Sequence, residues 1–439
     1  MKKNKLYYFL CVTTILASAS AGFATEKKVS STEPKKAEYS EIKSDFAKAL
    51  TEGKVMLDAR YRYEFVDQVN FANDAKASTL LTRVGYKTGA FHGLTGMVEM
   101  QNISAIGAEH YNDGGSTNSN AASSRLPTVV DPVGTELHQA YLDYAGIIPG
   151  TTINYGRHNI DRGNQRFIGS VAWRQNDQTQ DGVTVTNKSI KDTEIFYGYS
   201  YNINRIFGSD DVVGDYSGNV HMADITNKSF KFITIMPYAY LIDVQNPRAS
   251  IADGSQSYGL NLNGSADVTD GVKVLYLAEY AKQKDYGDNT TSYSADYVHG
   301  EIGASYVGIT LKGGYEELGS DGGRFAFRTP LATLHKWNGW ADQFLTTPAN
   351  GLQDRYGSIS YTINGIHEIV NDTNLELAYH DFSSDYTNTN YGTEWDFNID
   401  RKFAKYYSAG IKVADYNSKY GTVAGNDVTK VIFSLGMKF

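Results

Sequence analysis

The sequence predicts one all-β domain, a transmembrane antiparallel β-barrel of eighteen strands that follows a cleaved signal peptide. Three observations predict it. From residue 54 onward, apolar and polar residues alternate, and helical periodicity is almost absent. The segments that connect the alternating stretches are short and long in turn. The chain then ends on another alternating stretch, TKVIFSLGMKF, whose last residue is Phe439.

The N-terminus predicts a signal peptide over residues 1–24. MKKNK is a basic region, LYYFLCVTTILA a short apolar core, and SASAGFA a stretch of small residues. Cleavage is expected after Ala24, with Ala21 as the alternative, and it removes the only cysteine, Cys11. The following residues 25–53 are expected to form a periplasmic polar segment, disordered over 25–39 and ending in one short amphipathic helix from Ser40.

Residues 54–439 are expected to form the barrel, because stretches of about 9–11 residues can cross a bilayer as tilted strands. Pro237 lies inside the ninth strand and is expected at a bulge, since proline cannot donate a ladder hydrogen bond. The strands are expected near 54–66, 77–87, 93–105, 134–145, 151–158, 180–188, 192–203, 218–225, 230–244, 255–264, 271–284, 292–305, 308–318, 353–362, 373–383, 392–401, 404–415 and 427–439.

The connections between these strands are segregated by length. The even-numbered ones are short, such as GIIPG and VG, whereas the odd-numbered ones include the polar segments 106–133, 159–179 and 319–352. Outer-membrane barrels have short turns at the periplasmic rim and long loops at the other, and a soluble sandwich has no reason for this segregation. Both termini are therefore expected in the periplasm, with Phe439 as the signal that the barrel assembly machinery recognises.

The first strand, KVMLDARYRYEFV, indicates which residues line the lumen. A sheet in lipid must close on itself, and the closed sheet has one face toward lipid and one toward the lumen. The apolar face of this strand is therefore expected to contact outer-membrane lipid and lipopolysaccharide. The outward side chains are Val55, Leu57, Tyr61 and Phe65, and the inward ones are Asp58, Arg60, Arg62 and Glu64. Arg83 of the second strand faces inward by the same alternation. Eighteen strands enclose a lumen too wide for these side chains to fill, so we expect it to be wet or plugged by loops.

The segment 156–182 concentrates four of the fourteen arginines of the chain. They are Arg157, Arg162, Arg166 and Arg174. A guanidinium matches carboxylates, and an arginine cluster in a channel lowers the barrier for anions. The alternative is that these arginines pair with acids such as Asp161, Asp177 and Glu64 and brace an inward-folded loop. Both interpretations can hold together.

The segment 329–354 is the only long odd-numbered connection with apolar content. Five of its apolar residues are expected on one face of a short helix: Leu331, Leu334, Trp337, Trp340 and Phe344. Trp337 and Trp340 are interpreted either as a lid that stacks on sugar rings or as part of a loop packed on the barrel rim.

Composition and motifs argue against several functions. The chain has 49 acidic and 41 basic residues, a net charge of −8, which argues against a nucleic-acid partner. Its nine histidines are scattered, and it has no G-x-S-x-G, H-E-x-x-H or Walker motif, so we expect no enzyme and no cofactor. The loop NDGGSTNSN at 112–120 lacks the ligand order of a calcium loop, so no metal site is expected. A barrel enzyme with a rim site and a surface adhesin remain as rivals.

Several strings resemble the alginate-export family of outer-membrane porins. They are YRYEFVDQ at 61–68, TRVGYKTGAFHGL at 82–94, GTELHQAYLDY at 134–144, NQRFIGSVAWRQNDQTQDG at 164–182 and TPLATLHKWNGWAD at 329–342. The resemblance covers nearly all of 54–439.

This resemblance implies an eighteen-stranded barrel of a Gram-negative outer membrane that passes anions through a pore rich in arginine and lysine. The four arginines of 156–182 are then candidates for the anion path, together with Arg60, Arg62 and Arg83. We expect a porin for passive passage of small polar, mainly anionic, solutes or an anionic saccharide. The alternative is an export pore for an alginate-like polysaccharide.

Overall fold

The computed structural model describes residues 34–115, 125–245, 254–367, 370–419 and 425–439. The expected signal peptide lies outside these residues, as does the part of the 112–120 loop from residue 116 onward. The chain divides into two units, Met1–Lys48 and Ala49–Phe439, and each is described by itself.

The N-terminal unit contributes one helix, α2 (Pro34–Thr51). It begins at Pro34 rather than near Ser40, so the last part of the stretch that was expected to be disordered is helical. The physical reason is local, since proline is favoured at the first helical position and the residues after it are good helix formers. Among the described residues, no helix is both long enough and apolar enough to span a membrane.

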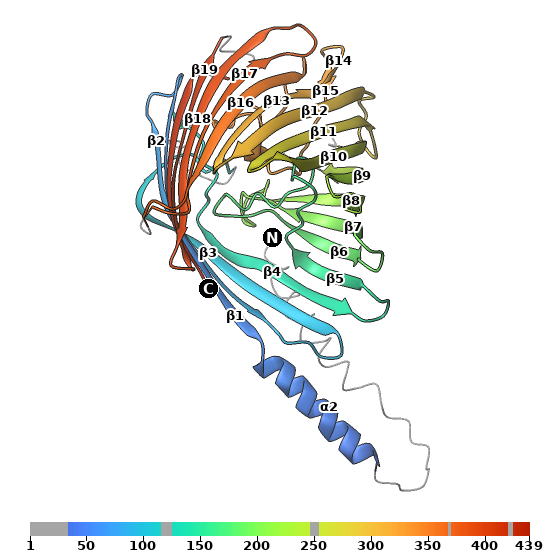
Figure 1. Cartoon of the computed structure of the whole chain (residues 1–439). Helices are drawn as coiled ribbons and strands as arrows, with labels where there is room; N and C mark the ends of the chain where they lie inside the picture. The colour runs from blue at the N-terminus through green and yellow to red at the C-terminus, as the bar shows by residue number, and fades with distance from the viewer. Residues whose placement is uncertain (1–33, 116–124, 246–253, 368–369, 420–424) are drawn as a thin grey trace. The chain divides into compact units, whose positions relative to one another are not determined.

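The second unit is a sheet of eighteen antiparallel strands, as the alternation predicted (Figure 1). All eighteen lie where the sequence placed them, with ends that differ by a few residues in most strands. They are β1 (Lys54–Gln68), β2 (Ala75–Lys87), β3 (Leu94–His110), β4 (Gly134–Ala145), β5 (Thr151–His158), β6 (Thr179–Asn187), β7 (Thr193–Asn204), β8 (Asp215–Asn227), β9 (Ile233–Gln245), β10 (Ser255–Thr269), β11 (Val272–Asp285), β12 (Ser294–Tyr306), β13 (Ile309–Leu318), β16 (Leu352–Ile363), β17 (Thr373–Ser383), β18 (Asn390–Phe403), β19 (Tyr407–Ser418) and β20 (Val428–Lys438).

The sheet closes into a barrel because β1 pairs with both β2 and β20. Leu57 lies opposite Val84 of β2, and Tyr61 lies opposite Leu435 of β20. The C-terminus therefore lies beside β1 (Figure 1). Closure leaves no strand edge open in this ring, which is what a sheet in lipid requires.

The two rims of the barrel differ as the sequence predicted. Short connections such as 146–150 and 307–308 join the even-numbered strands to the next odd-numbered ones at one rim. At the other rim lie 111–133, 159–178 and 319–351, the last of which carries the small hairpin β14 (Ser320–Asp321) and β15 (Phe325–Ala326). These are called here the short rim and the long rim.

Side chains alternate between the lumen and the outside as expected. In β1, Arg62 and Glu64 are buried in the lumen, whereas Val55 on the opposite face is 71% exposed. Apolar side chains such as Val98 and Ile302 are similarly exposed on the outer surface. A soluble protein would bury these faces, so the outer surface is suited to contact lipid.

Pro237 does not occupy a bulge, contrary to expectation. It lies opposite Leu260 of β10, within an unbroken register. On its other side, the pairing of β8 with β9 passes from Asp224↔Tyr238 directly to Asn227↔Ile235 without changing register. The missing N–H of proline is thus accommodated by a local gap in one ladder.

Candidate functional site

Two long-rim connections fold into the lumen and join there. Residues 159–178 meet residues 319–351 in a parallel bridge between Ile168 and Leu331, both fully buried. The backbone N–H of Gly169 donates to the carbonyl oxygen of Leu331 at 2.8 Å. These two connections are called here the constriction, because they are hydrogen-bonded to each other across the lumen.

The constriction is attached to β1 by arginines. Arg62 donates to the carbonyl oxygen of Trp173 and lies 3.4 Å from Asp131. Arg60 donates to the side-chain oxygen of Gln175 at 3.0 Å and to the carbonyl oxygen of Ala172 at 2.9 Å. These two arginines therefore hold the segment 172–175 against the barrel wall.

Arg174 belongs to the connection 159–178 and binds a carboxylate on the barrel wall, the reverse of the contacts that Arg60 and Arg62 make. It donates to Glu64 of β1 at 2.8 Å, and its guanidinium also lies 3.6 Å from Asp342. Arg174 is 4% exposed and Glu64 is fully buried. A buried charge needs such a partner, because desolvation alone would cost several kcal/mol per ion.

A third set of side chains attaches the end of the connection 159–178 to β2, β3 and β4. Arg83 pairs with Asp177, and the ring of His138 lies between Asp177 and Glu99. Burial raises the pKa of Asp177, but hydrogen bonding to His138 and the charge of Arg83 outweigh it, so this pKa is lowered. The carboxylate thus stays ionised inside the constriction.

Arg166 lies at the centre of the constriction, 1% exposed. It donates to Glu316 of β13 at 2.6 Å, to Thr329 at 3.2 Å and to Asn338 at 3.0 Å. Burial lowers the pKa of Arg166, but the charge of Glu316 together with the hydrogen bond to it and the interactions with Tyr297 outweigh burial, and the net shift is upward. Arg166 therefore joins both connections to the wall as a permanent cation.

Arg157 lies near the long-rim end of β5, whereas Arg162 lines the cavity on the short-rim side, and both keep partial exposure. Arg157 binds Asp181 bidentately at 2.7 and 2.9 Å. Arg162 binds Asp224 at 2.6 and 2.8 Å and Glu194 at 2.9 Å. Their side chains are 23% and 14% exposed, respectively. Six of the seven predicted arginines thus pair with carboxylates, and Arg60 binds amide and carbonyl oxygens.

The connection 319–351 does not form the expected helix. Its only helical turn is the 3-10 turn η2 (Leu334–Lys336). The backbone has positive φ at Asn338 and Asp342, which ends any helical continuation. Tertiary hydrogen bonds therefore override the apolar periodicity of this segment.

The two predicted lid residues are half-buried in the constriction. Trp337 lies 5.4 Å from the guanidinium of Arg166, and Trp340 lies 4.1 Å from the ammonium of Lys412 on β19. Both rings thus contact cations of the lumen, at distances typical of cation–π contacts. A role of either ring as a lid stays a prediction.

Sequence reasoning missed the contacts that attach 338–342 to β18. Glu394 accepts from the backbone N–H of Ala341 at 2.6 Å, and Asp396 accepts from that of Trp340 at 3.1 Å. A Cβ at Gly339 would lie 2.3 Å from Glu394, so only glycine permits this approach. Alternation in β18 places both carboxylates inward, but it does not reveal their backbone partners.

Asp342 makes a second set of contacts that sequence reasoning missed. It accepts from His335 at 2.8 Å and from Lys430 of β20 at 2.5 Å. Burial raises the pKa of Asp342, but its interactions with His335 and the charge of Lys430 outweigh burial and hold this pKa well below its usual value. The ring of Trp173 stacks on His335 at 3.5 Å, which joins the two connections again.

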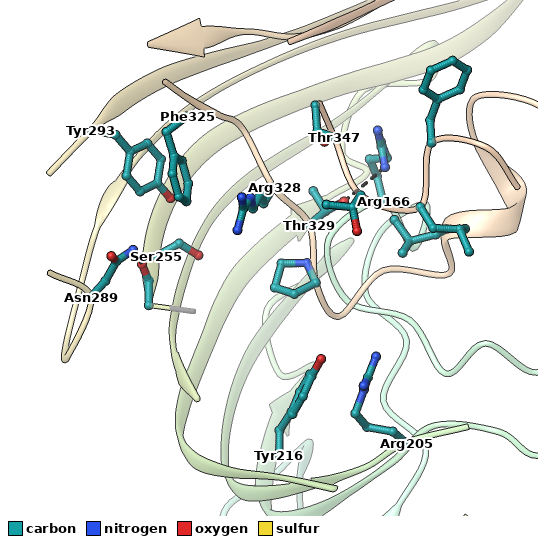
Figure 2. A pocket seen from close by; sticks show the side chains of 16 residues that line it. Arg166, Arg205, Tyr216, Ser255, Asn289, Tyr293, Phe325, Arg328, Thr329 and Thr347 are labelled. Atoms are coloured by element: carbon teal, nitrogen blue, oxygen red, sulfur yellow. Dashed lines mark hydrogen bonds between the residues drawn. The ribbon is translucent and has the colours of Figure 1, made fainter. Parts of the chain in front are cut away.

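Cavities lie on both sides of the constriction. A cavity of about 150 Å³ is lined by long-rim connections and includes Arg205 and Arg328 (Figure 2). A larger one of about 620 Å³ is lined by short-rim turns and by Arg162. Solutes of moderate size can therefore occupy the lumen from either side.

The fold is a closed eighteen-stranded antiparallel β-barrel with a charged lumen. No family model matches the chain, and no curated protein matches it. Solved structures do match. The crystal structure of Acinetobacter baumannii OccAB2 is 14% identical and has a TM-score of 0.69, over 89% of this chain and 99% of that one.

Two Pseudomonas aeruginosa structures are similar as well. OccK9 (OpdG) is 13% identical with a TM-score of 0.66, covering 89% of this chain and 100% of that one. OpdK, solved with vanillate, is 11% identical with a TM-score of 0.66, covering 89% and 99%. The similarity to these structures establishes the eighteen-stranded barrel fold.

Proposed function

We propose that the protein is an outer-membrane channel for passive passage of small polar, mainly anionic, solutes. The observation that carries the proposal is a closed barrel whose lumen is narrowed, between two cavities, by a charged constriction. In a channel of this kind, charged side chains at a narrow passage set which ions enter. The neighbour OpdK was solved with vanillate, which is a carboxylate, and this supports an anionic solute class.

We assign different tasks to the seven predicted arginines. Arg62, Arg83, Arg166 and Arg174 are almost fully buried and brace the constriction. Arg157 and Arg162 remain partly exposed and are proposed to contact the solute, and Arg162 lines the short-rim cavity together with Lys188 and Lys191. The focused field of a narrow lumen makes such charges more effective than surface charges.

The export of an alginate-like polysaccharide is not favoured. A polymer needs a passage that is clear along its whole length, whereas residues 159–178 and 319–351 are hydrogen-bonded to each other across the lumen. The resemblance to the alginate-export family is kept only at the level of barrel architecture. No described cluster favours catalysis or adhesion over passage.

The channel proposal is tested by conductance and reversal potential in planar bilayers under a salt gradient. We expect ion conductance, and we expect Arg162→Gln to shift the reversal potential toward cations, more strongly at low salt. Arg324→Gln is the matched control, because Arg324 is 76% exposed and pairs only locally with Asp321. Absence of conductance would refute the channel, and an unchanged potential in Arg162→Gln would remove Arg162 from the solute path.

The orientation is proposed from the two rims. The start of β1 and the end of β20 lie at the short rim, which is periplasmic in outer-membrane barrels. Phe439 donates its backbone N–H to Leu57 at 2.8 Å, and its ring lies 4.5 Å from that of Tyr406. We expect deletion of Phe439 to lower insertion into the outer membrane, measured by the amount of folded barrel in membrane fractions. Normal levels would contradict a role in assembly.

A further inference from the structure

Two carboxyl groups of β18 are buried side by side against the constriction. Glu394 and Asp396 are both fully buried, and because they are two residues apart on one strand, both point into the lumen. They lie within hydrogen-bonding distance of each other. Carboxylates are almost never fully buried unless they are paired, so this contact between two acids needs a physical explanation.

Each of the two carboxyl groups binds the constriction through one oxygen only. Oε1 of Glu394 accepts from the backbone N–H of Ala341, and Oδ2 of Asp396 accepts from that of Trp340. The remaining oxygens, Oε2 of Glu394 and Oδ1 of Asp396, are buried and have no donor in the described parts of the chain. A Cβ at Gly339 would lie 2.3 Å from Oε2, so the backbone of Gly339 covers this oxygen closely.

The basic groups nearest to Asp396 and Glu394 bind other carboxylates. Nε2 of His380 lies 3.7 Å from Asp396, but Nδ1 of the same ring binds Asp354 at 2.9 Å. Lys430 of β20 donates to Asp342. Neither side chain therefore supplies a donor to the two remaining oxygens.

The groups that face the pair from β19 are also engaged elsewhere. Lys412 donates to Nε2 of His335 at 3.0 Å. Tyr416 lies opposite Glu394 in the sheet, and its hydroxyl donates to the carbonyl oxygen of Tyr391 at 2.6 Å. The only group left to satisfy each of the two remaining oxygens, among the described residues, is the other carboxyl group.

One proton explains this arrangement. Placed on either remaining oxygen, it forms an O–H that donates to the other, so both oxygens gain a hydrogen bond at once. The backbone N–H groups of Trp340 and Ala341 keep their acceptors, and the pair has one negative charge instead of two. Two carboxylates that share one site keep such a proton, because both cannot ionise at close range.

We propose that Glu394 and Asp396 share one proton at neutral pH and act together as positioning residues that hold 338–342 against the wall. The inference rests on the proposed channel function, because it gives the pair a role in the width of the passage. Trp340 is the side chain that is positioned, since its N–H binds Asp396 while its ring lies 4.1 Å from the ammonium of Lys412. Detaching 338–342 from the wall should therefore widen the passage.

The first test is infrared spectroscopy of the full-length barrel in detergent at neutral pH. A protonated carboxyl group has a C=O stretch that is separate from the bands of carboxylates, and we expect Glu394→Gln to lose this band. Asp400→Asn is the matched control, because Asp400 is an exposed acid of the same strand, and it should leave the band unchanged. The heat-dependent electrophoretic mobility of each variant reports whether its barrel is folded.

The second test measures single channels in planar bilayers. Glu394→Ala removes the acceptor of Ala341 and the partner of Asp396, so it should raise the conductance and admit larger neutral polymers. The amide of Glu394→Gln can accept from Ala341 and donate to Asp396, so this conservative variant should restore both properties. It also keeps the single negative charge of the pair, so we expect no shift of its reversal potential.

Two results would overturn the shared proton. One is a carboxyl band that is unchanged in folded Glu394→Gln, and the other is a reversal potential of that variant shifted toward anions, as the loss of an ionised carboxylate requires. Wild-type conductance in Glu394→Ala would remove the positioning role. A barrel that does not conduct, but loses the band in Glu394→Gln, keeps the shared proton and loses only the channel function.

Discussion

The connection 159–178 is attached to opposite parts of the barrel in two different ways. Toward β1 and β2, it is held by buried ion pairs such as Arg174 with Glu64. Toward β9 and β12, it is held by rings: Phe167 lies 5.0 Å from Tyr238 and 5.5 Å from Tyr297, centre to centre.

The two attachments are expected to contribute differently to the stability of the constriction and to the ion selectivity of the lumen. Aromatic burial is non-directional and favourable without an exact partner. A buried ion pair contributes little net stability, yet it destabilises strongly when one partner is removed. We infer that the aromatic side supplies more of the stability of the constriction, while the charged side braces it against β1 and β2 and also determines the electrostatics of the lumen.

Removing the ring of Phe167 is expected to have the largest effect. Phe167→Ala should lower the free energy of unfolding by about 3–5 kcal/mol, because the ring is buried and leaves a cavity among Tyr238, Tyr297 and Phe327. Urea unfolding in detergent measures this, and the loss should be the same at low and high salt. Phe230→Ala, on an exposed turn residue, is the control. A loss below about 1 kcal/mol would contradict the aromatic anchor.

The outer face of β1 offers a third kind of contact for comparison, the expected contact with lipid. Leu57→Arg is expected to destabilise the barrel by about 2–4 kcal/mol if the position lies near the bilayer midplane. Equilibrium folding into lipid vesicles measures the change. Lys54→Arg, at the exposed start of the same strand, should have almost no effect. Equal stability of Leu57→Arg and the wild type would show that this face does not meet hydrocarbon.

Neutralising the charged side should have a smaller effect on stability. Glu64→Gln removes the charge facing Arg174, but Asp131 and Asp342 remain within 4 Å of that guanidinium. We expect a loss of about 1–3 kcal/mol in unfolding free energy, together with a shift of the reversal potential toward anions. Asp67→Asn, exposed on the same strand, is the control. A change in stability without any change in reversal potential would separate the ion pair from selectivity.

The smallest expected effect is a pH dependence that originates at His335. Burial lowers the pKa of His335 well below its usual value; Asp342 opposes this, and Lys412 reinforces it. Lys412 donates to Nε2 of the ring at 3.0 Å while Nδ1 faces Asp342, an arrangement that requires the neutral imidazole.

The sign of the effect follows from proton linkage. The unfolded chain takes up a proton near pH 6.5 and the folded one does not, so the unfolding free energy should fall by up to about 1.4 kcal/mol per pH unit below 6.5. Unfolding between pH 5.0 and 6.5 measures the slope, which His335→Gln should reduce. His92→Gln, on a short-rim turn, should leave the slope unchanged. An identical slope in the wild type and His335→Gln would refute a neutral buried imidazole.

The strands could be predicted because their signal is local. Alternation within a strand indicates its inward face without knowledge of its partner, and all eighteen expected strands are present. The site could not be predicted to the same extent, since Arg174 and Glu64 are 110 residues apart and Arg166 and Glu316 are 150 apart. Alternation gives the direction of such side chains but not the height at which they meet across the lumen.

The prediction of a short helix within the segment 329–354 was wrong for the same reason. Its apolar spacing favours a helix, but Asn338 and Asp342 take positive φ, and their side chains bind Asp354 of β16 and Lys430 of β20. Arg205 and Arg328 were missed because they lie in different connections, far apart in the sequence. Only the folded connections bring them to one cavity.

The bridge between Ile168 and Leu331 has a consequence for the order of assembly. Apart from the seam of β1 with β20, the wall forms between consecutive strands of the ring, whereas this bridge joins residues 163 positions apart. Distant contacts form late, because their loops must close first. The hairpins of the wall therefore form before the bridge does. The seam of β1 with β20 joins residues up to 380 positions apart, such as Asp58 and Lys438, so by the same argument the ring closes around a constriction that has already formed.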